Sequence, residues 1–186
     1  EIVCKSIKGF AYPEEMNFLT QHEGRNNFIS DLAVNLKGNS LVLFTYVEKH
    51  GKLLYEWILE KANGRKVFFI HGGVEAEDRE AVRHITEQET DAIIVASYGT
   101  FSTGVNIRNL HNIVFSSPTK SKIRSLQSIG RVLRLGENKD AATLYDIADD
   151  LRYGPYTNFT LKHYEERVKI YSEEKFPFTT NNVRIN

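Results

Sequence analysis

Cysteine is almost absent from this chain, which has a single one, Cys4, among its 186 residues. No disulfide can therefore form within the chain, so we expect a reducing, cytoplasmic compartment. No histidine or second cysteine is patterned around Cys4, which favours a small buried hydrophobe over a metal ligand. The sequence thus predicts neither a disulfide scaffold nor a metal site.

Long apolar runs are also missing. No run approaches the roughly 18 residues that a membrane-spanning helix requires, and the N-terminus does not resemble a signal peptide, so we expect no membrane contact. The chain begins with Glu1 rather than Met, directly on a strand-like segment, and we expect it to be part of a longer protein.

Net charge is absent as well, because 24 lysine and arginine side chains balance 24 aspartate and glutamate side chains. This balance excludes a protein that binds a polyanion over its whole surface, but it leaves room for a local basic groove. Hydrophobic residues make up 41% of the chain, which is typical of a globular protein with a buried core. At this length we expect one generous domain or a domain with appendages.

A short apolar strand followed by an amphipathic helix is the pattern that recurs along the chain. Five segments are expected to be strands: 41–47, 66–72, 91–98, 111–117 and 141–149. Continuous apolar strands that alternate with helices indicate an α/β fold, a mostly parallel sheet with helices on both faces. We also expect one or two helices over 12–36, an irregular stretch over 99–109, and a long polar helix over about 155–174.

Polar residues gather where the expected strands end. They are Thr45 and Tyr46, the stretch 71–73, the stretch 97–104, and the pair 116–117. Ligands of open parallel sheets bind beyond the carboxyl ends of the strands, where hydroxyls, backbone amides and glycines suit phosphate oxygens. Ordinary turn chemistry is the alternative explanation for any single one of these loops.

The stretch "SYGTFSTGVNI" (97–107) is the loop that folding explains least. It places small polar residues between two strongly apolar strands and is longer than most such connections. Phe101 and Val105 can anchor it to the core. Three of its small residues are then expected to face a ligand: Ser97, Thr103 and Gly104.

The stretch "LQSIGRVLRLG" (126–136) predicts a helix with one anion-binding face. At helical spacing that face carries Gln127, Gly130, Arg131 and Arg134, with Leu126, Ile129 and Leu133 on the other side. Two arginines, an amide and a bare glycine are suited to a close approach to an anion. The alternative is that Arg131 and Arg134 pair with surface carboxylates such as Asp149 and Asp150.

The sequence contains no phosphate-binding loop that would hold a nucleotide for these arginines. It contains no G-x-x-x-x-G-K-[ST] loop, and no strand ends in Asp-Glu beside such a loop to hold Mg²⁺. The arginines therefore face an anion that another domain presents. An arginine finger works in this way, because its guanidinium stabilises a γ-phosphate that is bound elsewhere.

Four motifs in order resemble the second, C-terminal RecA-like lobe of superfamily 2 helicases and translocases. "LVLFTYVEKHGKLLYEWI" resembles motif IV, "FFIHGGVEAEDRE" motif IVa, "IIVASYGTFSTGVNI" motif V and "QSIGRVLR" motif VI, over roughly 40 to 150. Gln127 and the pair Leu133–Arg134 differ from the DEAD-box RNA helicases and are similar to XPB-like and restriction-type DNA motors. "VASYGTFSTG", "SKIRSLQSIGRVLR" and "YSEEKF" resemble the phage UvsW-type helicases, which remodel branched DNA.

This resemblance implies a three-layer RecA-like fold, a domain division and an ATP site. It divides the chain into a strand and helical lead-in from an interlobe linker (1–39), the lobe (40–152), and a C-terminal helix and tail (153–186). The expected catalytic residues are Arg131, Arg134 and Gln127, and the expected ATP-binding residues are Gly104, Asn106 and Gly130. Asn106 stands where the family usually has aspartate, so only an amide is available there for hydrogen bonding. ATP and Mg²⁺ are expected to be held mainly by an N-terminal lobe.

The resemblance also implies contacts to the DNA backbone. The expected residues are Thr45, Gly72, Ser97 and Thr103, with His71 and Tyr98, for which a structural role is an equal alternative. The implied function is the motor lobe of an ATP-dependent DNA helicase that is inactive without its N-terminal lobe. DNA and that lobe are its expected partners, in the cytoplasm of a bacterial host if a phage encodes it. A nucleic-acid-binding module with no catalytic part is the alternative.

Overall fold

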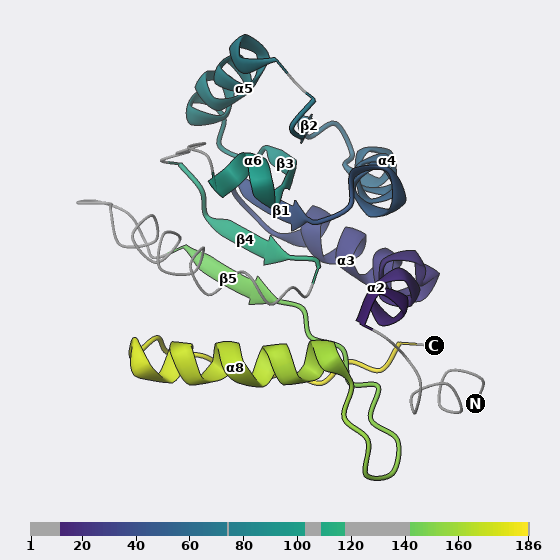
Figure 1. Cartoon of the computed structure of the whole chain (residues 1–186). Helices are drawn as coiled ribbons and strands as arrows, with labels where there is room; N and C mark the ends of the chain where they lie inside the picture. The colour runs from purple at the N-terminus through teal and green to yellow at the C-terminus, as the bar shows by residue number, and fades with distance from the viewer. Residues whose placement is uncertain (1–11, 74, 103–108, 118–141, 186) are drawn as a thin grey trace.

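The protein is an α/β domain built on one parallel sheet (Figure 1). The computed structural model describes residues 12–73, 75–102, 109–117 and 142–185. The strands are β1 (Ser40–Phe44), β2 (Val67–Ile70), β3 (Ile93–Ser97), β4 (Asn112–Phe115) and β5 (Thr143–Asp146). They form a five-stranded sheet in the order β2-β3-β1-β4-β5, and every neighbouring pair is parallel. The predicted α/β class is confirmed.

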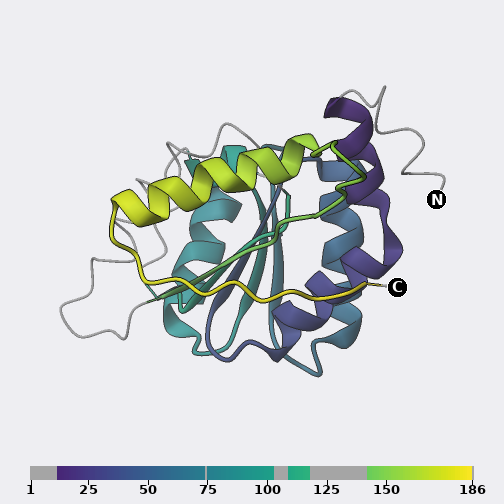
Figure 2. The same cartoon turned by 90° about the horizontal axis from the view of Figure 1, so that it is seen from below.

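Helices cover both faces of this sheet. They are α2 (Tyr12–Gln21), α3 (Glu23–Asn35), the short π-helical turn η2 (Val47–Gly51), α4 (Lys52–Lys61), α5 (Ala76–Gln88), α6 (Tyr98–Ser102) and α8 (Phe159–Glu173). Figure 2 shows the strands between α5 on one side and α3 with α4 on the other. None of the helices in the described part is both long and apolar enough to cross a bilayer.

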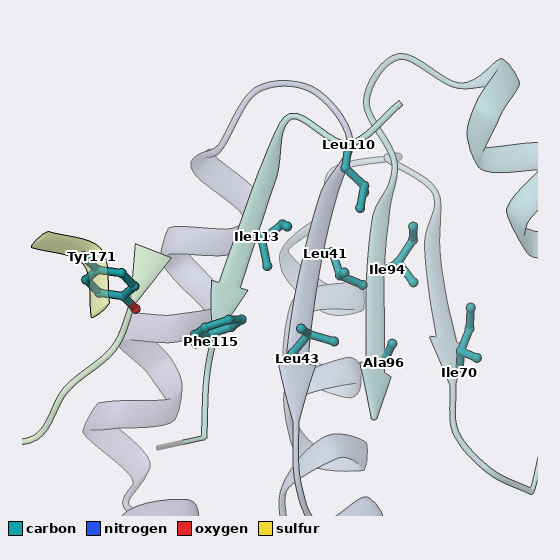
Figure 3. Packing of buried hydrophobic residues seen from close by; sticks show 9 residues of the cluster. All are labelled: Leu41, Leu43, Ile70, Ile94, Ala96, Leu110, Ile113, Phe115 and Tyr171. Atoms are coloured by element: carbon teal, nitrogen blue, oxygen red, sulfur yellow. The ribbon is translucent and has the colours of Figure 1, made fainter. Parts of the chain in front are cut away.

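Two apolar clusters result from the alternation of side chains along the strands. Leu41 and Leu43 point to one face and belong to a cluster that Tyr171 of α8 joins (Figure 3). Val82 of α5 packs against this cluster. Val42 and Phe44 point to the opposite face, where they meet α3 and α4. The core is therefore a layer on each side of the sheet, and it fixes the positions of the strand ends.

Residue 51 has to be glycine because Phe44 lies against it. A Cβ atom on Gly51 would lie 2.5 Å from the Phe44 ring, which is fully buried and stacked on Phe69. The backbone of Gly51 is helical, with φ −61°, so the constraint is one of space rather than of conformation. This contact fixes the junction between η2 and α4.

We expect Gly51→Ala to lower the free energy of unfolding by about 1–2 kcal/mol, because overpacking outweighs the better helix propensity of alanine. Urea unfolding measures the change. Gly99→Ala is the matched control, since its Cβ would meet nothing within 4 Å. Equal stability of the two variants would show that the Phe44 ring can move aside.

Helix α6 is absent from the predicted pattern, which has an irregular stretch from residue 99. The structure instead continues β3 directly into a short helix over Tyr98–Ser102. The Ser97 hydroxyl lies 2.8 Å from the Thr100 hydroxyl and accepts the Thr100 N–H at 3.4 Å. This local capping compensates for poor helix formers such as Gly99.

Buried polar contacts join α2 to α8 and α3 to the segment after β5. Glu15 of α2 is buried, and its carboxylate accepts hydrogen bonds from the backbone N–H groups of Phe159 and Thr160 at the start of α8. Arg25 of α3 makes a two-pronged ion pair with Asp149, at 2.7 and 2.9 Å. Both α2 and α8 are thus packed with the lobe, while the proposed division at residues 39 and 152 stays a prediction.

Candidate functional site

All five strands point the same way, so their carboxyl ends lie on one edge of the sheet. The strand order places His71 after β2, Ser97 at the end of β3, Thr45 after β1 and Ser117 after β4. Four of the polar positions predicted from sequence are thereby brought to one edge. We call this set of strand ends the carboxyl edge.

Thr45 lies near the middle of the carboxyl edge. Its backbone N–H donates to the Ser117 Oγ at 3.2 Å, which links the end of β1 to the end of β4. Among the described residues, its own Oγ1 is buried and has no hydrogen-bond partner. An unpaired buried hydroxyl is costly, and such groups call for an explanation.

Ser97 is buried, whereas Tyr98 is partly buried and its hydroxyl is engaged within the protein. The Ser97 side chain is buried and is engaged by Thr100. The Tyr98 hydroxyl donates to the Ser117 carbonyl at 3.3 Å, and its ring packs on Phe115. Burial raises the pKa of the Tyr98 phenol well above its usual value, and the nearby Asp146 carboxylate raises it further. The phenol is therefore a neutral donor at physiological pH.

The turn after β2 presents backbone rather than side chains. His71 stacks obliquely on Phe69 at 5.1 Å, and its Nδ1 accepts the Gly73 N–H at 3.1 Å. Gly72 is exposed, its φ lies outside the left-handed region, and an added Cβ would meet nothing within 4 Å. Neither the conformation of Gly72 nor its surroundings in the described structure requires a glycine there.

Two buried residues beside the carboxyl edge, His50 and Asn26, were not predicted from the sequence. His50 of η2 is fully buried between Ser117 and Asn26, with ring nitrogens 3.0 and 3.1 Å from their side-chain oxygens. Histidine and asparagine in amphipathic helical segments are expected on the solvent side, so no signal in the pattern marks them. Only the topology brings together residues that are so distant in the sequence.

The remaining predicted site residues lie outside the described residues: Thr103, Gly104, Asn106, Gln127, Gly130, Arg131 and Arg134. The carboxylates that offered an alternative role for the arginines hold other partners. Asp149 is paired with Arg25, and Asp150 with the exposed Arg152. In the described part of the chain, no three His, Cys, Asp or Glu residues are grouped closely enough to hold a metal ion.

The sequence of residues 24–136 matches the family of the helicase conserved C-terminal domain. The chain belongs to this family. The match includes the stretches of motifs IV, IVa, V and VI, so the resemblance to a superfamily 2 C-terminal lobe is confirmed. In this helicase domain, the carboxyl edge carries the described motif residues that were predicted to contact a ligand, such as Thr45, His71 and Ser97.

Known relatives of this helicase domain include a phage helicase. The ATP-dependent DNA helicase uvsW of Enterobacteria phage T4 is 36% identical over 96% of this chain, which covers 38% of that relative. A putative type I restriction enzyme MjaIXP endonuclease subunit of Methanocaldococcus jannaschii is 26% identical over 74% of this chain, which covers 15% of that relative.

A solved structure agrees with this relationship. The crystal structure of T4 UvsW matches with a TM-score of 0.77 at 36% identity, over 92% of this chain and 37% of that chain. The fold is therefore the RecA-like fold of UvsW, and the resemblance to UvsW-type helicases is confirmed. The chain spans less than two fifths of the length of its phage relative.

Proposed function

We propose that this chain is the C-terminal motor lobe of an ATP-dependent DNA helicase. The observation that carries the proposal is the 36% identity to an ATP-dependent DNA helicase across 96% of the chain. An N-terminal lobe binds ATP with Mg²⁺, and Arg131 and Arg134 of this lobe approach the γ-phosphate with Gln127 beside them. The protein works in the cytoplasm and remodels branched or duplex DNA.

The carboxyl edge is the DNA-binding part of this proposal. Its backbone amides, together with the Thr45 hydroxyl, bind phosphate oxygens, which positions the strand without reading bases. Thr45 supports this role because its buried Oγ1 lacks a partner in the described structure and gains one when a phosphate oxygen approaches. Gly72 supports it because its exposed backbone leaves a phosphate free to come close.

The binding of ATP and the binding of DNA are coupled because the paired lobes have two states. ATP between the lobes closes the cleft, and hydrolysis opens it again, so that the backbone contacts of each lobe advance in turn. Such coupling requires that each ligand binds the two states with different free energies. This chain contributes the arginines and one of the two sets of DNA contacts, with Gly104, Gly130 and Asn106 lining the nucleotide.

DNA-stimulated ATPase activity tests the proposal directly. We expect this chain alone to have none, because its sequence contains no phosphate-binding loop. Addition of the N-terminal lobe in the same polypeptide should restore hydrolysis and its stimulation by DNA. Hydrolysis by this chain alone would contradict the assignment of ATP binding to another lobe.

A nucleic-acid-binding module with no catalytic part is the second candidate, favoured only by the polar carboxyl edge. Binding by this chain alone should then be weak and fall steeply with salt, since phosphate contacts release counterions. A gel shift at two salt concentrations measures this binding. Tight binding without any ATPase activity in the intact protein would favour the module over the motor.

We expect Gly72→Ala to weaken DNA binding by the intact helicase at least about tenfold. The added Cβ keeps the phosphate from the backbone N–H, and a hydrogen bond to a charged group contributes about 1.5–3 kcal/mol. Fluorescence anisotropy with a labelled forked duplex measures the change. The thermal midpoint should stay unchanged, since the new Cβ meets no neighbour. Thr90→Ala, exposed at the opposite edge of the sheet, is the control. Unaltered affinity would remove Gly72 from the interface.

A further inference from the structure

Ser117 joins three strand ends at the carboxyl edge. It is fully buried after β4, and its Oγ accepts the backbone N–H of Thr45, which follows β1. Its carbonyl accepts the hydroxyl of Tyr98, which follows β3. Ser117 is also the residue before Pro118, where the stretch that carries Arg131 and Arg134 begins.

His50 holds the Ser117 hydroxyl from the other side. The His50 Nδ1 lies 3.0 Å from the Ser117 Oγ, and its Nε2 lies 3.1 Å from the Asn26 Oδ1. The Asn26 amide nitrogen donates to the Thr20 carbonyl, so its oxygen is turned to the imidazole as an acceptor. In the tautomer with its proton on Nε2, the imidazole donates to the Asn26 Oδ1 and its Nδ1 accepts the Ser117 O–H.

The neighbouring serine shows what is particular to Ser117. Ser116 is equally buried, and its hydroxyl donates to the Leu43 carbonyl on the adjacent strand at 2.6 Å. That bond supports one strand pair that the sheet already forms. Ser117 instead connects three strand ends with α3 through His50, and fully satisfied buried networks of this kind hold one geometry.

We propose that Ser117 and His50 are positioning residues that couple DNA contact to ATP hydrolysis. The inference rests on the proposed function and extends it to residues that do not touch DNA or ATP. DNA contact at Thr45 or Tyr98 shifts a group that is hydrogen-bonded to Ser117. Pro118 restricts the backbone conformations of Ser117, which leaves Ser117 less freedom to absorb a shift before the stretch that carries Arg131 and Arg134.

Ser117→Ala in the intact helicase tests the coupling, with Ser116→Ala as the matched control. The readout is the ratio of the ATPase rate with a saturating forked duplex to the rate without DNA. Ser117→Ala should lower this ratio at least about fivefold, the lower end of coupling between sites, with the Kd for the duplex within about twofold of the parent. Ser116→Ala should keep the parental ratio.

Substitutions of His50 separate coupling from stability. His50→Leu removes both ring contacts, whereas His50→Asn keeps a polar group near the position of Nδ1, within reach of Ser117. We expect His50→Asn to retain more of the ratio than His50→Leu at similar thermal midpoints. His50→Asn also provides the test if Ser117→Ala does not fold.

The possible outcomes separate the coupling from the proposed function. A parent protein without any DNA stimulation would overturn the proposed function and the coupling with it. A stimulated parent whose ratio survives in Ser117→Ala, or falls equally in Ser116→Ala, would overturn the coupling alone. Loss of the ratio only in Ser117→Ala and His50→Leu would support it.

Discussion

Arg134→Ala should lower the ATP turnover of the intact helicase by about 10³ or more, the scale on which other arginine fingers act. The guanidinium is expected to stabilise charge on the γ-phosphate only in the transition state, so DNA binding should change little. Steady-state ATPase assays at saturating forked duplex measure turnover, and fluorescence anisotropy measures affinity for the same duplex.

Two further variants of the intact helicase sharpen this result. Arg134→Lys keeps the positive charge but loses the planar fork of donors, so it should recover only a small part of the turnover. Arg152→Ala removes an exposed arginine that is paired with Asp150 and should leave turnover unaltered. Near-normal turnover in Arg134→Ala would remove this residue from the active site.

Asp146→Asn should lower the free energy of unfolding by roughly 3–5 kcal/mol, the usual cost of breaking a buried ion pair. Asp146, at the end of β5, binds both Nε and Nη2 of Arg167 in α8, at 2.7 and 2.8 Å. The side chains of Asp146 and Arg167 are only 8% and 2% exposed, so the remaining guanidinium would stay buried without its counter-ion.

The cost is high because Arg167 has little else to hold its charge. Burial lowers the pKa of Arg167, but the Asp146 carboxylate outweighs burial and raises the pKa above its usual value. Among the described residues, its Nη1 is already buried without a partner. Arg167 thus depends on one carboxylate for its neutralisation.

Urea unfolding of the single and double variants measures this dependence. The double variant Asp146→Leu with Arg167→Met should recover part of the loss, since an apolar pair carries no desolvation penalty, although the Tyr171 hydroxyl loses Asp146 as its acceptor. Asp150→Asn is the matched control, because the Asp150–Arg152 pair is exposed and solvent screens it. Equal effects at Asp146 and Asp150 would show that α8 is not held by buried charge.

The layers of the fold follow from the sequence because apolar runs dictate them. All five strands overlap the predicted segments, and β1 begins one residue earlier than predicted, at Ser40. Each strand is shorter at its carboxyl end, as in β1, which ends at Phe44 rather than at residue 47. Thr45 and Tyr46 continue the apolar run in composition, yet their backbone already turns towards η2. Hydrophobic periodicity records burial and does not record where hydrogen-bonded pairing stops.

The polar interior could not be predicted in the same way. Arg25 and Asp149 are 124 positions apart, and His50 and Ser117 are 67 positions apart, so only the sheet topology brings each pair together. In a helical pattern, an arginine or a histidine of this kind appears as a solvated residue. Arg131 and Arg134 were instead singled out by their helical spacing and by the missing phosphate loop, and the resemblance to motif VI then assigned them a catalytic role.

Strand β5 and helix α8 lie beyond the residues that match the family, so the matched residues alone do not contain the whole sheet. The match ends at residue 136, before β5, although β4 hydrogen-bonds β5 along its whole length. All four residues of β4 are buried, and β5 with α8 lies outside them (Figure 1). A polypeptide cut at the family boundary would present β4 as an open, apolar sheet edge, the kind of edge on which chains aggregate. Strand β5 therefore covers a sheet edge that would otherwise favour self-association.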